Sequence, residues 1–183
     1  MRKTCVTPLN TVGYGVTGKS DYFNMKYIKI VPEIVLSIGD RTVFINDNSN
    51  DEIIKLHINL ENWLGDDLLW NFPEVIVTKK LKEALEKTDF TGFEFDKMEV
   101  TKDVYFYDNY KLKKPLPKFY WMKVTGNENK DDIFLQNWDL YISERLLIYL
   151  KDNHNIDNAE INPVYDKDTD DFIMSLIQRD NGL

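Results

Sequence analysis

The chain of 183 residues is poor in the residues that build disulfide scaffolds and metal sites. It has one cysteine, Cys5, so an intramolecular disulfide is excluded and a reducing compartment is indicated. The two histidines, His57 and His154, are far apart, and neither has a cysteine or another histidine at metal-ligand spacing. We therefore expect no bound metal, and packing or surface roles for both histidines.

Long apolar runs are also missing from the chain. No stretch reaches the roughly 18 residues that a membrane-spanning helix needs. At the N-terminus, Arg2 and Lys3 are not followed by the apolar segment of a secretion signal. The sequence therefore predicts a cytoplasmic protein that does not enter a membrane.

Positive charge is scarce relative to negative charge. The formal net charge is -8 and the pI is near 4.8, so the chain lacks the excess of lysine and arginine that binds nucleic-acid phosphates. The same balance favours solubility or a basic partner. Hydrophobic residues make up 43% of the chain and aromatic residues 13%, which predicts a packed core rather than disorder.

What the chain does contain is an internal repeat. Residues 75–100 and 140–165 each have the pattern of an apolar strand, a helix cap, an amphipathic helix, a turn and a second strand. Thr78 and Ser143 are the expected N-caps, because their hydroxyls can accept from amides of the first helical turn. One additional residue in the second copy brings the second strands back into register. The expected apolar faces of the two helices consist of Leu81, Ala84, Leu85, Leu146, Leu147 and Leu150.

The remaining segments predict a fold rich in strands. Residues 64–69 are expected to form a loop with a short helical turn, and residues 172–177 a short C-terminal helix. Alternating apolar residues predict further strands at 26–30, 42–45, 52–59 and 119–124. We expect one α+β domain over residues 25–183, with a mainly antiparallel sheet, two related strand–helix–strand units and the terminal helix. Residues 1–24 are polar and aperiodic and are expected to be an N-terminal extension.

One segment of that extension matches a phosphate-binding pattern. Gly13, Gly18, Lys19 and Ser20 occupy the fixed positions of G-x-x-x-x-G-K-S, in which the lysine reaches a terminal phosphate and the serine holds magnesium. The pattern works only between a buried strand and a helix. Pro8 blocks such a strand, and the residues after Ser20 have strand periodicity, so we expect no bound cofactor here.

Acidic and aromatic residues supply the candidates for an interface. Asp66 and Asp67 form a carboxylate pair between Trp63 and Trp70, and no nucleophile or base can be named beside them. Tryptophan is enriched where proteins meet, so these four residues are the predicted interface candidates. A second acidic segment, 166–171, begins like a calcium loop but lacks its glycine and its final glutamate, so we interpret it as a solvated turn.

Several segments together carry a resemblance to a known family. They are Trp63–Leu69, Phe72-Pro73, Val75–Phe95, Leu116–Trp121 and Asp139–Leu150. In this order they resemble a group of small bacterial proteins assigned to polymorphic-toxin immunity, over about residues 25–164. The resemblance implies a cytoplasmic protein that neutralises a cognate toxin by binding it, without catalytic residues. Members often begin at a methionine placed like Met25, which implies that residues 1–24 are an addition.

The sequence thus predicts a non-catalytic immunity protein whose partner is a protein toxin, and the net charge of -8 favours a basic one. Two alternatives remain open. The first is an adaptor or regulatory protein that binds an unknown partner. The second is a nucleotide-binding protein that uses Gly13 to Ser20.

Overall fold

The computed structural model describes residues 26–47 and 50–162. It has the expected α+β architecture, with mostly antiparallel strand pairs. The first sheet has the strand order β11 (Ile133–Gln136), β12 (Asp139–Ser143), β1 (Tyr27–Val31) and β13 (Glu160–Ile161). The second has the order β6 (Leu68–Asn71), β7 (Glu74–Thr78), β10 (Phe119–Val124) and β8 (Phe93–Asp96).

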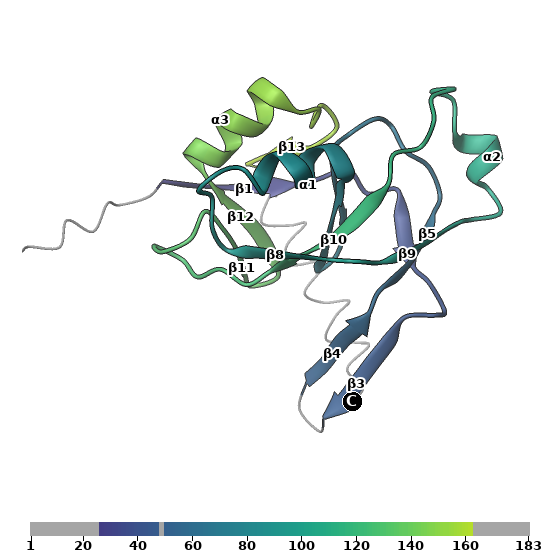
Figure 1. The fold of residues 1–183 in the computed structure, drawn as a ribbon, viewed down its shortest axis with the longest axis horizontal. Helices are drawn as coiled ribbons and strands as arrows, with labels where there is room; N and C mark the ends of the chain where they lie inside the picture. The colour runs from purple at the N-terminus through teal and green to yellow at the C-terminus, as the bar shows by residue number, and fades with distance from the viewer. Residues whose placement is uncertain (1–25, 48–49, 163–183) are drawn as a thin grey trace, which may run out of the picture.

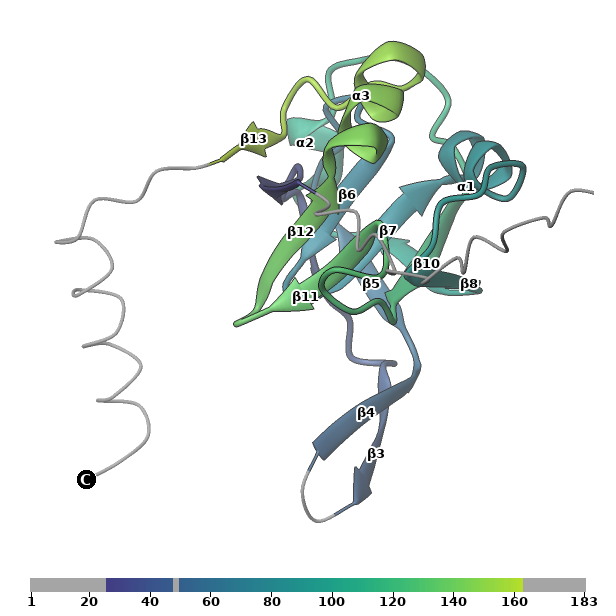
Figure 2. The same cartoon turned by 90° about the vertical axis from the view of Figure 1, so that its left-hand side faces the viewer.

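A smaller sheet and a separate hairpin complete the strands. The small sheet has the order β2 (Leu36–Ile38), β5 (His57–Leu60) and β9 (Glu99–Lys102), and its β5–β9 pair is parallel. The hairpin consists of β3 (Val43–Asp47) and β4 (Asn50–Lys55), which pair only with each other. The helices are α1 (Lys79–Leu85), α2 (Phe106–Asn109) and α3 (Glu144–Asn153). Figures 1 and 2 show the β3–β4 hairpin extending from the body on the side opposite α1 and α3.

The repeat appears as two units with the same hydrogen-bonding register. In each unit a hairpin (β6–β7 or β11–β12) leads through the cap into a helix, and the strand after the helix returns to the same sheet. A strand from elsewhere in the chain, β10 or β1, lies between the strands that flank the helix. Phe119 pairs with Thr78 and Tyr27 with Ser143, so even this inserted strand has the same register in both units.

Strand direction follows from that insertion. The strands before and after each helix are both antiparallel to the inserted strand, so they run parallel to each other without pairing directly. The sheets therefore remain antiparallel despite their strand–helix–strand connections. Met122 pairs with Phe95 in one unit, and its counterpart Ile30 pairs with Ile161 in the other, which reflects the one-residue insertion in the second copy.

Both predicted helix caps are confirmed. The hydroxyl of Thr78 accepts from the amide of Leu81 at 3.3 Å, and that of Ser143 accepts from the amide of Leu146 at 3.2 Å. The leucines of both helices are buried in one core cluster, which is shared with strands of both sheets. Ala84 is only half-buried. Burial of these apolar faces holds the two units together.

Three predicted elements are wrong in detail. Leu68 and Leu69 begin β6 rather than a helical turn, because pairing with β7 buries both of them. The predicted strand at 52–59 is divided at the buried Leu56 into β4 and β5, which belong to different sheets. The second strand expected in the first repeat copy, before residue 100, is likewise divided into β8 and β9. The expected C-terminal helix at 172–177 lies outside the described residues.

The two units are joined by a pair of matching aspartate clusters. Asp67 lies eleven residues before Thr78, and its carboxylate accepts from that hydroxyl at 2.6 Å. Asp132 lies eleven residues before Ser143 and accepts from that hydroxyl at 2.7 Å. A cation two residues after each cap completes the cluster: Lys80 Nζ is 3.0 Å from Asp67, and Arg145 Nη2 is 2.6 Å from Asp132. Each aspartate therefore fixes the start of the helix in its own unit.

Each aspartate also holds the loop that follows the helix of the other unit. The amide of Asn155, after α3, donates to the carboxylate of Asp67 at 3.2 Å, and its carbonyl accepts from the Asp67 amide at 2.7 Å. Thr91, after α1, makes the same two contacts with Asp132, at 3.0 and 3.1 Å. The two units are therefore linked reciprocally: the loop after each helix binds the aspartate that precedes the hairpin of the other unit.

The pKa values of both aspartates reflect these contacts. Burial alone would raise the pKa of Asp67, but hydrogen bonds from His154, Thr78, Lys80 and Asn155 outweigh it and hold that pKa well below its usual range. The pKa of Asp132 is also lowered, because hydrogen bonds led by that from Arg145 outweigh the effect of burial. Both side chains are therefore ionised at neutral pH.

Replacement of Asp132 by alanine should lower the free energy of unfolding by about 1–3 kcal/mol, because buried donors lose their acceptor. Equilibrium unfolding in urea measures this change. Asp89→Ala is the matched control: Asp89 contacts the same Arg145 but its side chain is 86% exposed, and its loss should cost less than about 0.5 kcal/mol. Equal effects of the two substitutions would contradict a structural role for the buried cluster.

Candidate functional site

The four predicted interface residues are buried. Trp63 is 8% exposed, Asp66 0%, Asp67 6% and Trp70 5%. The indole of Trp63 donates to the Asp66 carbonyl at 2.8 Å, and the Asp66 carboxylate accepts from the amide and the side chain of Asn158 at 3.0 and 2.8 Å. These side chains therefore link chain segments inside the protein through hydrogen bonds and packing. A partner that docks on the described surface would not reach them.

The phosphate-loop match cannot be placed in this framework. Gly13, Gly18, Lys19 and Ser20 lie outside the described residues, as does the acidic segment 166–171. Among the residues that the structure describes, no group of three or more His, Cys, Asp or Glu side chains is arranged to hold a metal ion.

His57 stands in a polar arrangement that superficially matches a catalytic triad. Its Nε2 is 2.8 Å from the hydroxyl of Thr101, and its Nδ1 is 3.5 Å from Asp40. The amide of Arg41 donates to Nδ1 at 3.1 Å, and Arg41 Nη2 lies 3.2 Å from Nε2. The hydroxyl of Thr101 donates to the side-chain oxygen of Asn59 at 2.6 Å. His57 and Thr101 thus belong to a network with Arg41 and Asn59, and the Asp40 side chain is 91% exposed, unlike the buried aspartate of a catalytic triad.

His154 is the C-cap residue of α3, and its side chain is 3% exposed. Its Nδ1 lies 3.2 Å from the Asp67 carboxylate, and its ring packs at 5.7 Å from that of Tyr149. His154 is therefore part of the aspartate cluster that closes the repeat.

Sequence reasoning missed a cleft between three hairpins and strand β10. It has a volume of about 410 Å³, which is within the common range for ligand sites, and it lies where β3–β4 meets the tips of the two repeated hairpins. We call it the hairpin cleft. Its lining comprises Phe44, Glu52 and Ile53 from β3–β4, Pro73 and Glu74 from β6–β7, Trp121 to Val124 from β10, and Leu135 and Trp138 from β11–β12.

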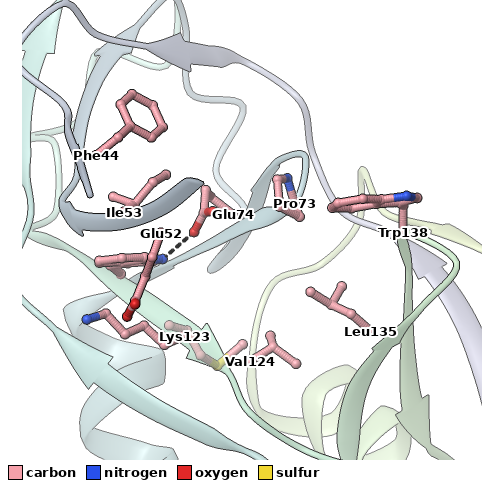
Figure 3. A pocket seen from close by; sticks show the side chains of 11 residues that line it. Phe44, Glu52, Ile53, Pro73, Glu74, Lys123, Val124, Leu135 and Trp138 are labelled. Carbon is pink, nitrogen blue, oxygen red and sulfur yellow. Dashed lines mark hydrogen bonds between the residues drawn. The ribbon is translucent and has the colours of Figure 1, made fainter. Parts of the chain in front are cut away.

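The tips of the two repeated hairpins meet at the edge of this cleft. Each tip is a two-residue turn, Phe72-Pro73 in one unit and Asn137-Trp138 in the other. The rings of Phe72 and Trp138 pack at 5.6 Å, although they are 54% and 65% exposed. Figure 3 shows Trp138 and Phe44 at opposite ends of the cleft, with Glu74 between them.

Trp138 occupies an unusual backbone conformation. Asn137 and Trp138 have φ values of 50° and 68°, as a two-residue hairpin turn requires, and glycine is the favoured second residue of such a turn. A bulky side chain at positive φ is strained. An exposed tryptophan held in a strained turn is a reason to look for function at this position. Large aromatic residues at both turn tips are the sequence signal that could have indicated the cleft.

Exposed apolar side chains continue along the β3–β4 hairpin. Phe44 is 50% exposed, and Val43, Ile45 and Ile54 are exposed to a similar degree. Because β3 and β4 have no other partner strand, each leaves one edge of main-chain donors and acceptors unpaired within the described residues. A two-stranded hairpin is only marginally stable by itself. Phe44 and Ile53 of this hairpin line the hairpin cleft, so the cleft extends onto an exposed hairpin.

The electrostatics of the cleft centre on Glu74. One of its carboxylate oxygens accepts from the Trp121 indole at 2.6 Å, the contact drawn as a dashed line in Figure 3. Burial raises the pKa of Glu74, and this effect outweighs the lowering by Trp121 and by the charge of Lys123. Lys123 itself pairs with Asp96 at 3.0 Å. The Glu74 carboxylate is therefore less well stabilised than a surface carboxylate.

Comparison of the chain with known protein families, with curated proteins and with solved structures found no match. In residues 26–47 and 50–162, no helix combines the length and apolar character needed to cross a membrane.

Glu33 is a buried carboxylate whose pKa makes the stability of the protein depend on pH. Glu33 is 3% exposed and accepts from the amides of Leu64 and Asp66 at 2.6 and 3.3 Å. Burial raises its pKa from an ordinary value of 4.5 to about 7, in spite of these hydrogen bonds. The folded state then binds more protons than the unfolded state between these two pH values. The free energy of unfolding should therefore fall as pH rises through this window.

Glu33→Gln should reduce this fall by an amount on the order of 3 kcal/mol between pH 5 and pH 8. Burial also raises the pKa values of Asp66 and Glu74, so part of the fall should remain. Urea unfolding across that range measures it, and Asp67 stays ionised throughout because its pKa is lowered. Glu61→Gln, at an exposed site, is the control and should keep the pH dependence of the parent protein. A Glu33→Gln variant with the parent's pH dependence would show that Glu33 is not the titrating group.

Proposed function

We propose that the protein is an immunity-type binding protein that neutralises a toxin by occluding it and catalyses no reaction itself. The observation that carries this proposal is the concentration of exposed apolar and aromatic side chains around the hairpin cleft. Soluble monomeric proteins rarely expose contiguous apolar patches without a use for them. Phe44, Phe72 and Trp138 are also of the residue types that dominate the energetics of protein interfaces.

The projecting hairpin supports a protein as the partner. A strand of the partner could add to an open edge of β3 or β4, and main-chain hydrogen bonds would then provide affinity. Such an addition would also stabilise this hairpin, because β3 and β4 pair only with each other and a two-stranded hairpin is only marginally stable. The net charge of -8 favours association with a basic protein, since opposite charges accelerate encounter.

The family resemblance makes a toxin the first partner to test. It concerns most of the described chain, including both units of the repeat. An adaptor or regulator that uses the same surface for another partner is the alternative. The identity of the bound protein separates the two proposals: a toxin encoded by a neighbouring gene supports the first, and a non-toxic partner the second.

Co-expression of the protein with the product of a neighbouring toxin gene should rescue growth, and the two proteins should co-purify. Trp138→Ala and Phe44→Ala should each weaken the complex by about 30-fold, the size typical of an interface hot spot. Isothermal titration calorimetry measures the affinities. Tyr107→Ala is the control, because Tyr107 is 73% exposed on α2 outside the cleft and should leave binding unchanged.

Binding that is equally strong in the Trp138 and Phe44 variants would place the interface elsewhere. Failure to bind or to neutralise any neighbouring toxin would count against the immunity function itself. Capture of a non-toxic protein in a manner sensitive to Trp138→Ala would favour the adaptor alternative.

A further inference from the structure

The hairpin cleft contains more negative than positive charge. Glu52 and Glu74 line it, together with a single cation, Lys123. The charge of Lys123 is balanced by Asp96, whose carboxylate lies 3.0 Å away and outside the lining. Neither Glu52 nor Glu74 forms an ion pair with any described residue. The cleft therefore offers two carboxylates to a cation from outside the protein.

Glu74 is the more informative of the two carboxylates. It lies partly buried against the indole of Trp121, which donates to one of its oxygens. Its second oxygen has no donor among the described residues. A positively charged group in the cleft would stabilise this carboxylate by its charge and hydrogen bonds, in place of the water that burial removes. Lys123 cannot do so fully, because its ammonium group is held by Asp96 and lies 4.2 Å from the centre of the Trp121 ring.

The aromatic lining favours the same kind of group. Trp138 and Phe44 both face the cleft and are half or more exposed, so their ring faces are accessible. Aromatic faces attract cations, and tryptophan does so most strongly. A guanidinium group suits this setting better than an ammonium group. It is planar, stacks on rings, is weakly hydrated and can donate two parallel hydrogen bonds to a carboxylate.

We propose that the hairpin cleft is a binding site for an arginine side chain of a protein partner, whose guanidinium group pairs with Glu74 and Glu52. The chain segments on either side of that arginine would pack against Trp138 and Phe44. A cleft of about 410 Å³ has room for an arginine together with part of the segment that carries it. This inference rests on the proposed function, because it takes the occupant to be the protein that the surface binds.

The test uses the full-length protein and two small probes of nearly the same shape. N-acetyl-arginine amide carries the guanidinium charge, whereas N-acetyl-citrulline amide replaces it by a neutral urea. The indole N–H signals of Trp121 and Trp138 in NMR spectra of the isotope-labelled protein report on the cleft. We expect saturable shifts with the arginine probe at millimolar concentrations, and at least a tenfold weaker response to the citrulline probe.

Three charge-removing variants locate the response. Glu74→Gln keeps an acceptor for Trp121, so the fold should persist, and a thermal unfolding midpoint close to that of the parent protein would verify this. Glu74→Gln and Glu52→Gln should each weaken the arginine response at least threefold. Glu61→Gln removes the same charge at an exposed site outside the cleft and should have no effect.

An equal response to citrulline, or an arginine response unchanged in both cleft variants, would overturn the proposed site. Its failure can be distinguished from that of the proposed function. Normal binding of the toxin without any response to the arginine probe would reject the arginine site and support the immunity function. Binding of the arginine probe through Glu74 without neutralisation of any neighbouring toxin would support the guanidinium site and reject the immunity function.

Discussion

Two buried aspartates determine how the halves of this protein fit together. Asp67 and Asp132 each fix the cap of a helix in one unit and the loop after the helix of the other unit. Because the contacts are reciprocal, neither unit is complete without its counterpart. The two units also meet at the tips of their hairpins, where the rings of Phe72 and Trp138 pack at 5.6 Å.

The repeat and its helix caps could be predicted from the sequence because their causes are local. A cap hydroxyl bonds an amide three residues later, and an apolar helix face repeats within two turns. The aspartates could have been noticed too, since each precedes its cap by eleven residues. Their partners Asn155 and Thr91 could not, because those contacts join segments that are distant in sequence. For the same reason the Asp66-Asp67 pair was interpreted as interface residues, whereas its donors are internal.

The candidate site was harder to foresee, because three hairpins and strand β10, from separate parts of the chain, create it. Periodicity assigns Phe44 to a strand, but it does not show that this strand projects from the body and stays exposed (Figure 2). Glu74 and Lys123 have no special pattern in the sequence, and their setting arises only where β7 lies beside β10. The aromatic residues at the hairpin tips were the one available signal. They stand at turn positions where glycine or a small polar residue is usual.

The protein combines two reciprocally linked units with an exposed aromatic cleft that contains two carboxylates. The most direct test of its central claim is hydrogen–deuterium exchange of the protein, free and bound to its captured partner. We expect slower exchange on binding at the β3–β4 hairpin and at both hairpin tips, with α1 and α3 unchanged. Protection confined to the helices, with the hairpin cleft unaffected, would contradict the proposal that this surface is where the protein acts.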